Sequence, residues 1–267
     1  MSPSRMVLRA ALLVVASLLL ITAQAPAAKA DLLKDILDRG VIRIGTTMDN
    51  PPYGSYDAAG KPVGFDIEFG QMIGQAMGVK VEVVSQVMAN RIPMLLTKKV
   101  DILVSSFGLV PSRALQVMYS EPYTNNLEAL WGPASIKITG PNDLGTLKIA
   151  AGVGTIQDKA LTAMAPKANI VRFDSDATTV TAYVSGQADL MVGPATLAKQ
   201  VNDAYPQHKL EMKFPLLSGT SHIGVPQGEF TLLQFLNTYI YYLRVNNLLQ
   251  PLTLKYFGQD LGNLPPF

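Results

Sequence analysis

The sequence predicts an α/β protein built from two lobes around a central cleft, and two observations support this prediction. Short apolar runs rich in β-branched residues alternate with longer stretches of helical period, which is typical of α/β layering. In addition, Leu95–Val104 resembles Tyr183–Val192, since each segment holds a helix end, a polar turn, an Asp and an apolar strand. A chance likeness between two short segments is the alternative. Two similar lobes, in place of one continuous sheet, would enclose a cleft.

The expected elements follow one another along the chain. Strands are expected at the short apolar runs 41–45, 79–84, 101–104, 147–151, 169–173 and 189–192. Helices are expected between them, where apolar residues recur at helical spacing, at 66–77, 90–97, 156–165 and 178–185. The clearest helix lies near the C-terminus, because Leu232, Leu236, Tyr239 and Leu243 fall on one face. We expect it to end near Asn246.

The first 30 residues have the pattern of a secretory signal peptide. Arg5 and Arg9 precede the apolar run 10–21, and small residues follow it up to Ala30. A membrane-spanning helix needs about 20 apolar residues, so a retained anchor is the less favoured alternative. The chain has no cysteine, which excludes lipid attachment to an N-terminal cysteine. We therefore expect cleavage after Ala30 and export, and the family resemblance described below implies that the destination is the periplasm.

The composition excludes several classes of protein. A chain of 267 residues, 48% of them hydrophobic, can bury one large or two medium cores without disulfides. The absence of cysteine rules out thiol catalysis and Cys-ligated metals. The balance of 22 basic against 20 acidic residues argues against nucleic-acid binding. His208 and His222 lack metal-ligand spacing, so we expect no metal and no catalytic residue.

The segments that follow the expected strands should line the cleft, because ligands of open α/β sheets bind beyond the carboxyl ends of the strands. These segments are 46–53, 85–90 and 105–113 in the first half, and 152–157, 174–176 and 193–195 in the second. They carry the polar and aromatic side chains that a small-molecule site needs. The site is therefore expected between the lobes.

Motifs along almost the whole chain after the leader resemble those of one known family. The run 64–69, Gly-Phe-Asp-Ile-Glu-Phe, resembles the signature of the polar amino-acid family of extracellular solute-binding proteins, the receptors of ATP-binding cassette (ABC) importers. Further matching segments follow in the family's order: Ile42–Thr46 with Pro52 and Tyr53, Asn90–Pro93, Lys99–Asp101, Tyr119–Tyr123, Gly154 with Thr155, and Lys255–Gly258. Each segment is short, and their common order makes the resemblance specific. Within the signature, Asp66 is expected to cap the following helix.

The resemblance implies a type II periplasmic-binding fold of two lobes joined by two hinge strands. Lobe 1 would comprise residues 31–126 and 222–267, and lobe 2 residues 127–221. The hinges would lie at Asn125–Glu128 and Gly219–Ile223.

The resemblance also implies a function. We expect a monomeric receptor, not an enzyme, that captures a small carboxylate-bearing solute, an amino acid or a derivative, and presents it to an inner-membrane ABC permease. A binding protein that serves a sensor is one alternative. A dehydratase-like enzyme on the same fold is another, and it would need a cleft glutamate such as Glu68, Glu82 or Glu121.

Arg113 is the main candidate for ligand binding, because the resemblance implies that it clamps the ligand α-carboxylate. Its planar guanidinium offers two parallel donors for this role, and a solvated arginine is the alternative. Ser105, Ser106 and Gly108 of the same loop are further candidates, with turn formation as the alternative role of the serines. Val110 departs from the family, which commonly has a helix-capping Thr there.

In the second half, the amides of Gly154, Thr155 and Ile156 are expected to form an anion site at a helix N-terminus. Together with Arg113 they would grip one carboxylate from both lobes, so that binding favours closure. The glycines also resemble part of a dinucleotide fingerprint, but Gln157 stands where the third glycine is needed. We therefore expect no cofactor.

Four more candidates come from the first half. Asn50 stands where relatives often have an aromatic ring, and Tyr53 and Met88 would form apolar walls, with core packing as the alternative for Met88. Arg91 would be a second anion-binding group or a solvated residue of the first helical turn.

Pro194 is the departure that matters most for specificity. Amino-acid receptors of the family usually have an Asp here that receives the α-ammonium, whereas Pro has neither a carboxylate nor an N–H. A buried ammonium without a counter-charge is costly. Either the ligand lacks that group, or another acid such as Asp174 or Asp176 replaces the missing one.

Overall fold

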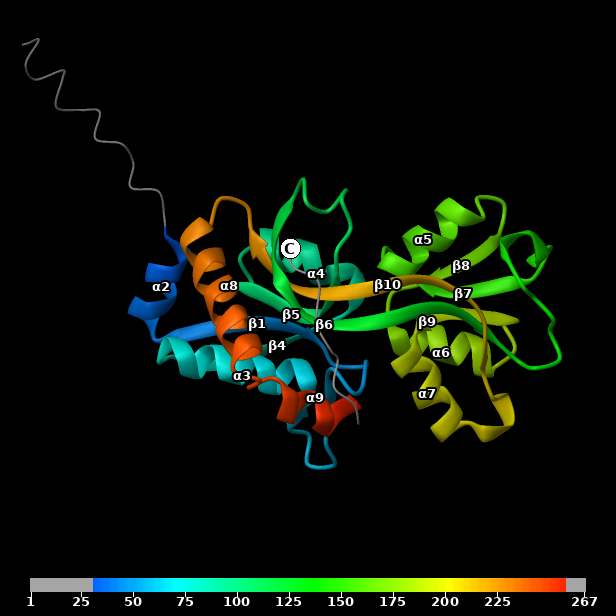
Figure 1. The fold of residues 1–267 in the computed structure, drawn as a ribbon, viewed down its shortest axis with the longest axis horizontal. Coiled ribbons are helices and arrows are strands. Elements are labelled where there is room, and N and C mark those ends of the chain that lie inside the picture. The colour runs from blue at the N-terminus through cyan, green and yellow to red at the C-terminus, as the bar shows by residue number, and fades with distance from the viewer. Residues whose placement is uncertain (1–30, 258–267) are drawn as a thin grey trace, which may run out of the picture. The chain divides into compact units, whose positions relative to one another are not determined.

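The structure is a computed structural model that describes residues 31–257 (Figure 1). The expected signal peptide and its cleavage site lie outside the described residues. The helices are α2 Leu32–Arg39, α3 Phe65–Met77, α4 Arg91–Leu96, α5 Ile156–Met164, α6 Asp176–Val184, α7 Ala195–Ala204, α8 Phe230–Val245 and α9 Gln250–Phe257. The strands are β1 Val41–Thr47, β2 Ser55–Tyr56, β3 Pro62–Val63, β4 Lys80–Gln86, β5 Ile102–Gly108, β6 Val117–Gly132, β7 Lys148–Gly152, β8 Asn169–Phe173, β9 Leu190–Pro194 and β10 Glu211–Pro226.

Two long strands, β6 and β10, join two groups of parallel strands. The sheet order is β4-β1-β5-β10-β6-β9-β7-β8, and β6 and β10 pair antiparallel along their whole length. Figure 1 shows this pair running side by side from β1, β4 and β5 to β7, β8 and β9. The prediction of two lobes in place of one continuous sheet therefore needs refinement, because the hydrogen bonding is continuous through this pair.

Each group of parallel strands has its own hydrophobic core. The first half, β1, β4 and β5 with α2–α4, α8 and α9, packs around Ile42, Phe69 and Leu236. In the second half, α5 packs with β7 and β9 around Ile149 and Val192, and α6 and α7 pack on the sheet around Met191 and Leu197. Two separate cores allow the halves to keep their internal packing while their relative orientation changes.

The expected elements are present, and several were missed. The strand over 169–173 has the predicted bounds, and the other predicted strands and helices begin or end within a few residues of the expected positions. Helices α2, α7 and α9 were not predicted. The helix expected after Val110 is a series of turns instead, in which the amide of Arg113 donates to the carbonyl of Val110 at 2.9 Å.

None of the helices between residues 31 and 257 has the length and apolar character needed to cross a bilayer.

Candidate functional site

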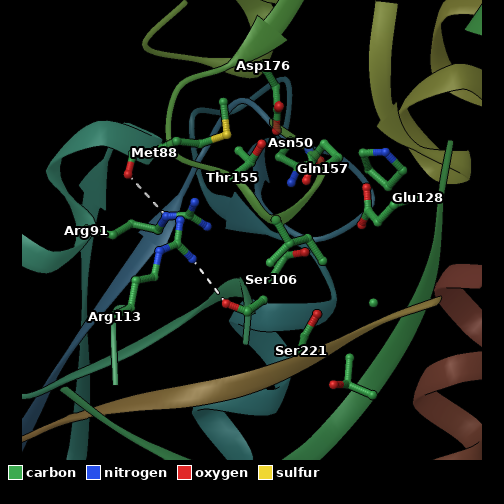
Figure 2. Close-up of a pocket in the computed structure, with 15 residues that line it drawn as sticks. Asn50, Met88, Arg91, Ser106, Arg113, Glu128, Thr155, Gln157, Asp176 and Ser221 are labelled. Carbon is green, nitrogen blue, oxygen red and sulfur yellow. Dashed lines mark hydrogen bonds between the residues drawn. The ribbon is translucent and has the colours of Figure 1, made fainter. Parts of the chain in front are cut away.

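A pocket lies where the two halves meet, and each of the six segments expected to line the cleft contributes to it. Its volume is about 30 Å³, so the halves enclose it tightly. The lining residues are Asn50, Met88, Arg91, Ser106, Gly108, Arg113, Glu128, Thr155, Ile156, Gln157, Asp176, Pro194, Gly219, Thr220 and Ser221 (Figure 2).

The halves touch around this pocket through glycines. A Cβ atom on Gly108 of β5 would lie 2.5 Å from Cγ2 of Ile156 in α5. A Cβ atom on Gly152 of β7 would lie 2.4 Å from Cε of Met88. Across the same boundary, the amide of Ala177 donates to Oδ2 of Asp49 at 3.2 Å. This close contact depends on the absence of side chains at the two glycines.

Two arginines form one end of the pocket, here called the arginine end. Arg91 donates to the carbonyls of Met88 at 3.2 Å and Ser105 at 3.1 Å, and Arg113 donates to Gly108 at 3.1 Å. Both guanidinium groups lie over the Phe107 ring, at 5.4 Å and 4.9 Å from its centroid. Figure 2 shows the two groups together on one side of the pocket.

The charges of the arginine end are buried. Burial, followed by the positive charge of Arg113, lowers the pKa of Arg91 to about 9. Burial also lowers the pKa of Arg113. Two neighbouring buried cations favour an anionic ligand, because an anion would offset both their desolvation and their mutual repulsion.

Asp66 fixes the loop that carries the arginine end, and it does not cap α3 as the sequence predicted. The N-cap of α3 is Gly64, which makes no side-chain capping bond. Asp66 instead accepts from the amide of Ser106 at 2.7 Å and from the hydroxyl of Tyr123 at 2.9 Å. Ser106 has a φ of 46°, which L-residues seldom adopt, so these bonds stabilise a strained turn. Burial raises the pKa of Asp66 to about 7.

Two carboxyl groups form the acid end of the pocket. Glu128 of β6 is 5% exposed and Asp176 of α6 is 4% exposed. Burial, then the charge of Asp176, raises the pKa of Glu128 to about 8. Burial, then the charge of Asp49, raises the pKa of Asp176 to about 7. The acid end therefore favours a cationic ligand group, because a cation would offset the burial and the mutual repulsion that disfavour ionisation of the two carboxyl groups.

Nine of the twelve residues predicted from the sequence to bind ligand line this pocket. They are Asn50, Met88, Arg91, Ser106, Gly108, Arg113, Thr155, Ile156 and Pro194.

The other three do not line the pocket. Tyr53 is fully buried in the core of the first half, with its ring against Phe65 and Phe257. Ser105 is buried behind the loop, where its hydroxyl lies 3.3 Å from that of Thr47. Gly154 lies at the edge, with its carbonyl accepting from Arg113.

The expected amide site at the start of α5 differs from the prediction. The amide of Gly154 donates to Oδ2 of Asp158 at 2.9 Å, and the hydroxyl of Thr155 accepts from the amide of Asp158 at 3.2 Å. Asp158 thus occupies the amide that was expected to bind an anion. Ile156 and Gln157 lie in the first helical turn, whose amides have no partner within the helix, and both line the pocket.

Five lining residues were not among the predicted ligand contacts: Glu128, Gln157, Gly219, Thr220 and Ser221. Four of them lie in the expected hinge segments, now seen as the middle of β6 and β10. Which of these side chains faces the pocket depends on how β6 and β10 pair with strands far away in sequence. Local sequence patterns do not reveal that register. Asp176 was foreseen only as a substitute for the acid missing at Pro194.

Comparison with protein families gives one decisive result. The model of the bacterial extracellular solute-binding proteins, family 3, matches residues 42–259. The chain belongs to this family.

Relatives of this solute-binding protein include receptors and an enzyme. The L-cystine-binding protein TcyJ of Escherichia coli (strain K12) is 25% identical, over 86% of this chain and 87% of that protein. A crystal structure of the solute receptors for L-cysteine of Neisseria gonorrhoeae superposes with a TM-score of 0.78 and 28% identity, over 84% of this chain and 93% of that one. The cyclohexadienyl dehydratase of Pseudomonas aeruginosa is 26% identical, over 66% of this chain and 67% of that enzyme.

The predicted family and fold class are thus confirmed: the chain is an extracellular solute-binding protein with the type II periplasmic-binding fold. Most of the similar curated proteins are named as amino-acid-binding proteins. The dehydratase among them shows that this fold also supports catalysis.

Proposed function

We propose that this protein is a periplasmic receptor that captures a small carboxylate-bearing solute, an amino acid or a derivative, and delivers it to an inner-membrane ABC permease. The observation that carries the proposal is the arginine end. Arg91 and Arg113 are held by backbone carbonyls and stacked on Phe107, so their guanidinium groups are already oriented before a ligand binds. Orientation in advance reduces the entropy lost on binding.

Closure of the two halves would bring residues of both halves into contact with the captured ligand. Arg113 belongs to the first half and bonds to the carbonyl of Gly154 in the second, so it already links the two. In this proposal the halves correspond to lobes 31–126 with 222–267, and 127–221, which move about β6 and β10. Because the pocket is small, ligand entry requires the halves to separate and then close again.

A thermal-shift screen tests the proposal. The protein lacking residues 1–30 would be incubated with the proteinogenic L-amino acids, L-cystine, their des-amino acids and opine-like conjugates. At 100 times its dissociation constant, a true ligand stabilises the folded state by about 2.7 kcal/mol. A clear shift with at least one carboxylate solute supports the receptor. No shift with any of them would contradict it.

A dehydratase is the second candidate function, and Glu128 favours it. The sequence suggested Glu68, Glu82 or Glu121 as its acid, but none of these lines the pocket. Glu68 instead bonds to Tyr256 at 2.6 Å, and Glu121 pairs with Arg244 at 3.4 Å. With a pKa of about 8, Glu128 is protonated at neutral pH and can donate its proton to a leaving hydroxyl, which departs as water while the electrons of a breaking C–H or C–carboxylate bond form the new double bond.

Mass spectrometry separates the two functions. The ligand found by thermal shift, and hydroxy acids that carry a cyclohexadienyl ring, would be incubated with the protein and searched for loss of water. A receptor returns its ligand unchanged. Loss of water that depends on Glu128 would favour the enzyme.

A further inference from the structure

Pro194 and Glu128 occupy neighbouring positions in the sheet. Strand β9 pairs antiparallel with β6, and in this register Pro194 lies opposite Glu128. Directly opposed residues in an antiparallel pair place their Cβ atoms about 5 Å apart on the same face. Both residues line the pocket. A carboxylate missing from position 194 is therefore available from the adjacent strand.

One oxygen of the Glu128 carboxyl group is left unpaired in the fold. This atom, Oε2, is buried and has no hydrogen-bond partner within the described residues 31–257. Arg91 and Arg113 of the pocket make their hydrogen bonds to backbone carbonyls, not to this group. A buried carboxyl without a partner destabilises the protein, so its presence in a pocket indicates a ligand group that pairs with it.

Asp176 extends this end of the pocket. It lies close enough to Glu128 for its charge, in addition to burial, to raise the pKa of the Glu128 carboxyl, while Asp49 raises and Arg91 lowers the pKa of Asp176. Figure 2 shows Asp176 and Glu128 away from the two guanidinium groups, on other sides of the pocket. The pocket therefore separates positive from negative charge, as a zwitterion requires.

We infer that Glu128, with Asp176 beside it, receives the α-ammonium of the ligand in place of the acid missing at Pro194. The solute is then a zwitterionic amino acid whose carboxylate lies at the arginine end, and an acid without an ammonium is a poor ligand. This assignment rests on the proposed function, and it decides between the two alternatives that Pro194 left open.

Paired ligands and three variants test the inference. The probes are the L-amino acid that gives the largest thermal shift and its des-amino analogue, in which hydrogen replaces the ammonium. Dissociation constants are measured by calorimetry for wild type, Glu128→Gln, Glu211→Gln and the double variant Glu128→Gln/Pro194→Asp. Gln keeps the shape of Glu128 without its charge, and Glu211 is an exposed control on β10.

Wild type and Glu211→Gln are expected to bind the amino acid about 100-fold or more tightly than its des-amino analogue. The analogue lacks the ammonium and leaves the buried carboxyl group of Glu128 without its partner. Glu128→Gln should reduce that preference to less than about tenfold. The double variant should restore part of it, because the carboxylate introduced at position 194 would lie opposite position 128, and Asp suits a helix N-cap.

Two results overturn the inference and can be told apart from failure of the receptor proposal. Equal binding of the amino acid and its des-amino analogue by wild type contradicts the inference alone. An undiminished preference in Glu128→Gln does the same. If wild type binds neither kind of acid, the proposed function itself fails.

Discussion

The two ends of the pocket are built in different ways. The arginine end comes from one loop and one short helix of the first half, and backbone carbonyls hold both guanidinium groups. The acid end comes from the middle of β6 and the start of α6, and Oε2 of Glu128 has no partner in the described chain. The arginine end is thus preorganised, whereas the acid end, in our inference, gains its partner only when the ligand binds. In the proposed function, the contrast means that the arginine end supplies affinity for any carboxylate and the acid end selects ligands that carry an ammonium.

A substitution at the arginine end should reduce ligand binding more than any other change. We expect Arg113→Ala to remove the ligand-induced stabilisation, which for wild type should be about 2.7 kcal/mol with ligand at 100 times its dissociation constant, because a carboxylate loses its paired donors. Thermal shift measures this. Arg244→Ala, which breaks an ion pair with Glu121 away from the pocket, is the matched control and should bind as wild type does. A full shift in Arg113→Ala would show that the carboxylate binds elsewhere.

A substitution that hinders closure of the two halves, and so keeps the two ends of the pocket apart, should have the next largest effect on binding. In Gly108→Ala the new methyl group would meet Ile156, so the halves would close less completely and affinity should fall about tenfold. Ile156→Ala in the same chain should recover part of the loss by making room. Gly140→Ala is the control, since a methyl group there meets nothing within 4 Å. Unchanged affinity in Gly108→Ala would mean that this contact plays no part in binding.

The acid end should make the stability of the ligand-free protein depend on pH. The pKa of Glu128 is raised from 4.5 to about 8, so its contribution to folding is most favourable below pH 4.5 and is lost as pH rises through 8. The charged groups that influence this site are Asp176, Asp49 and Arg91. Glu128→Gln removes the effect, and its melting temperature should exceed that of wild type increasingly between pH 5 and 8.

The expected slope of that difference is at most about 1.4 kcal/mol per pH unit. Chemical unfolding at several pH values measures it, with Glu211→Gln as the control for loss of an exposed carboxylate. Parallel curves for wild type and Glu128→Gln would mean that the carboxyl is ionised in the folded protein at little cost.

Arg113 at the arginine end was predictable from sequence, and Asp176 was named as a possible substitute acid, whereas Glu128 was missed for a physical reason. Arg113 follows a strand within a few residues, and its local turn, with the amide of Gln116 donating to its carbonyl at 2.8 Å, sets its direction. Glu128 reaches the pocket through the register of β6 with β9, which joins residues far apart in sequence. At α5 the local pattern misled, because Asp158 takes the amide expected to bind an anion.

In the fold, too, local features were predicted from the sequence and long-range pairing was not. Strand positions were predicted closely because alternating apolar runs are local, as for 169–173. Two hinge strands were expected from the family resemblance, but the length of the pairing between β6 and β10 was not. It depends on contacts between residues far apart in sequence, such as Val117 with Pro226 and Gly132 with Glu211. That pairing turns two expected hinge segments into the floor of the pocket.

A crystal structure of the protein with its bound amino acid tests the central claim most directly. The account predicts the ligand carboxylate on the guanidinium of Arg113 and the ammonium nitrogen within about 3 Å of a carboxylate oxygen of Glu128. An ammonium directed to solvent, with Glu128 making no contact to the ligand, would contradict it.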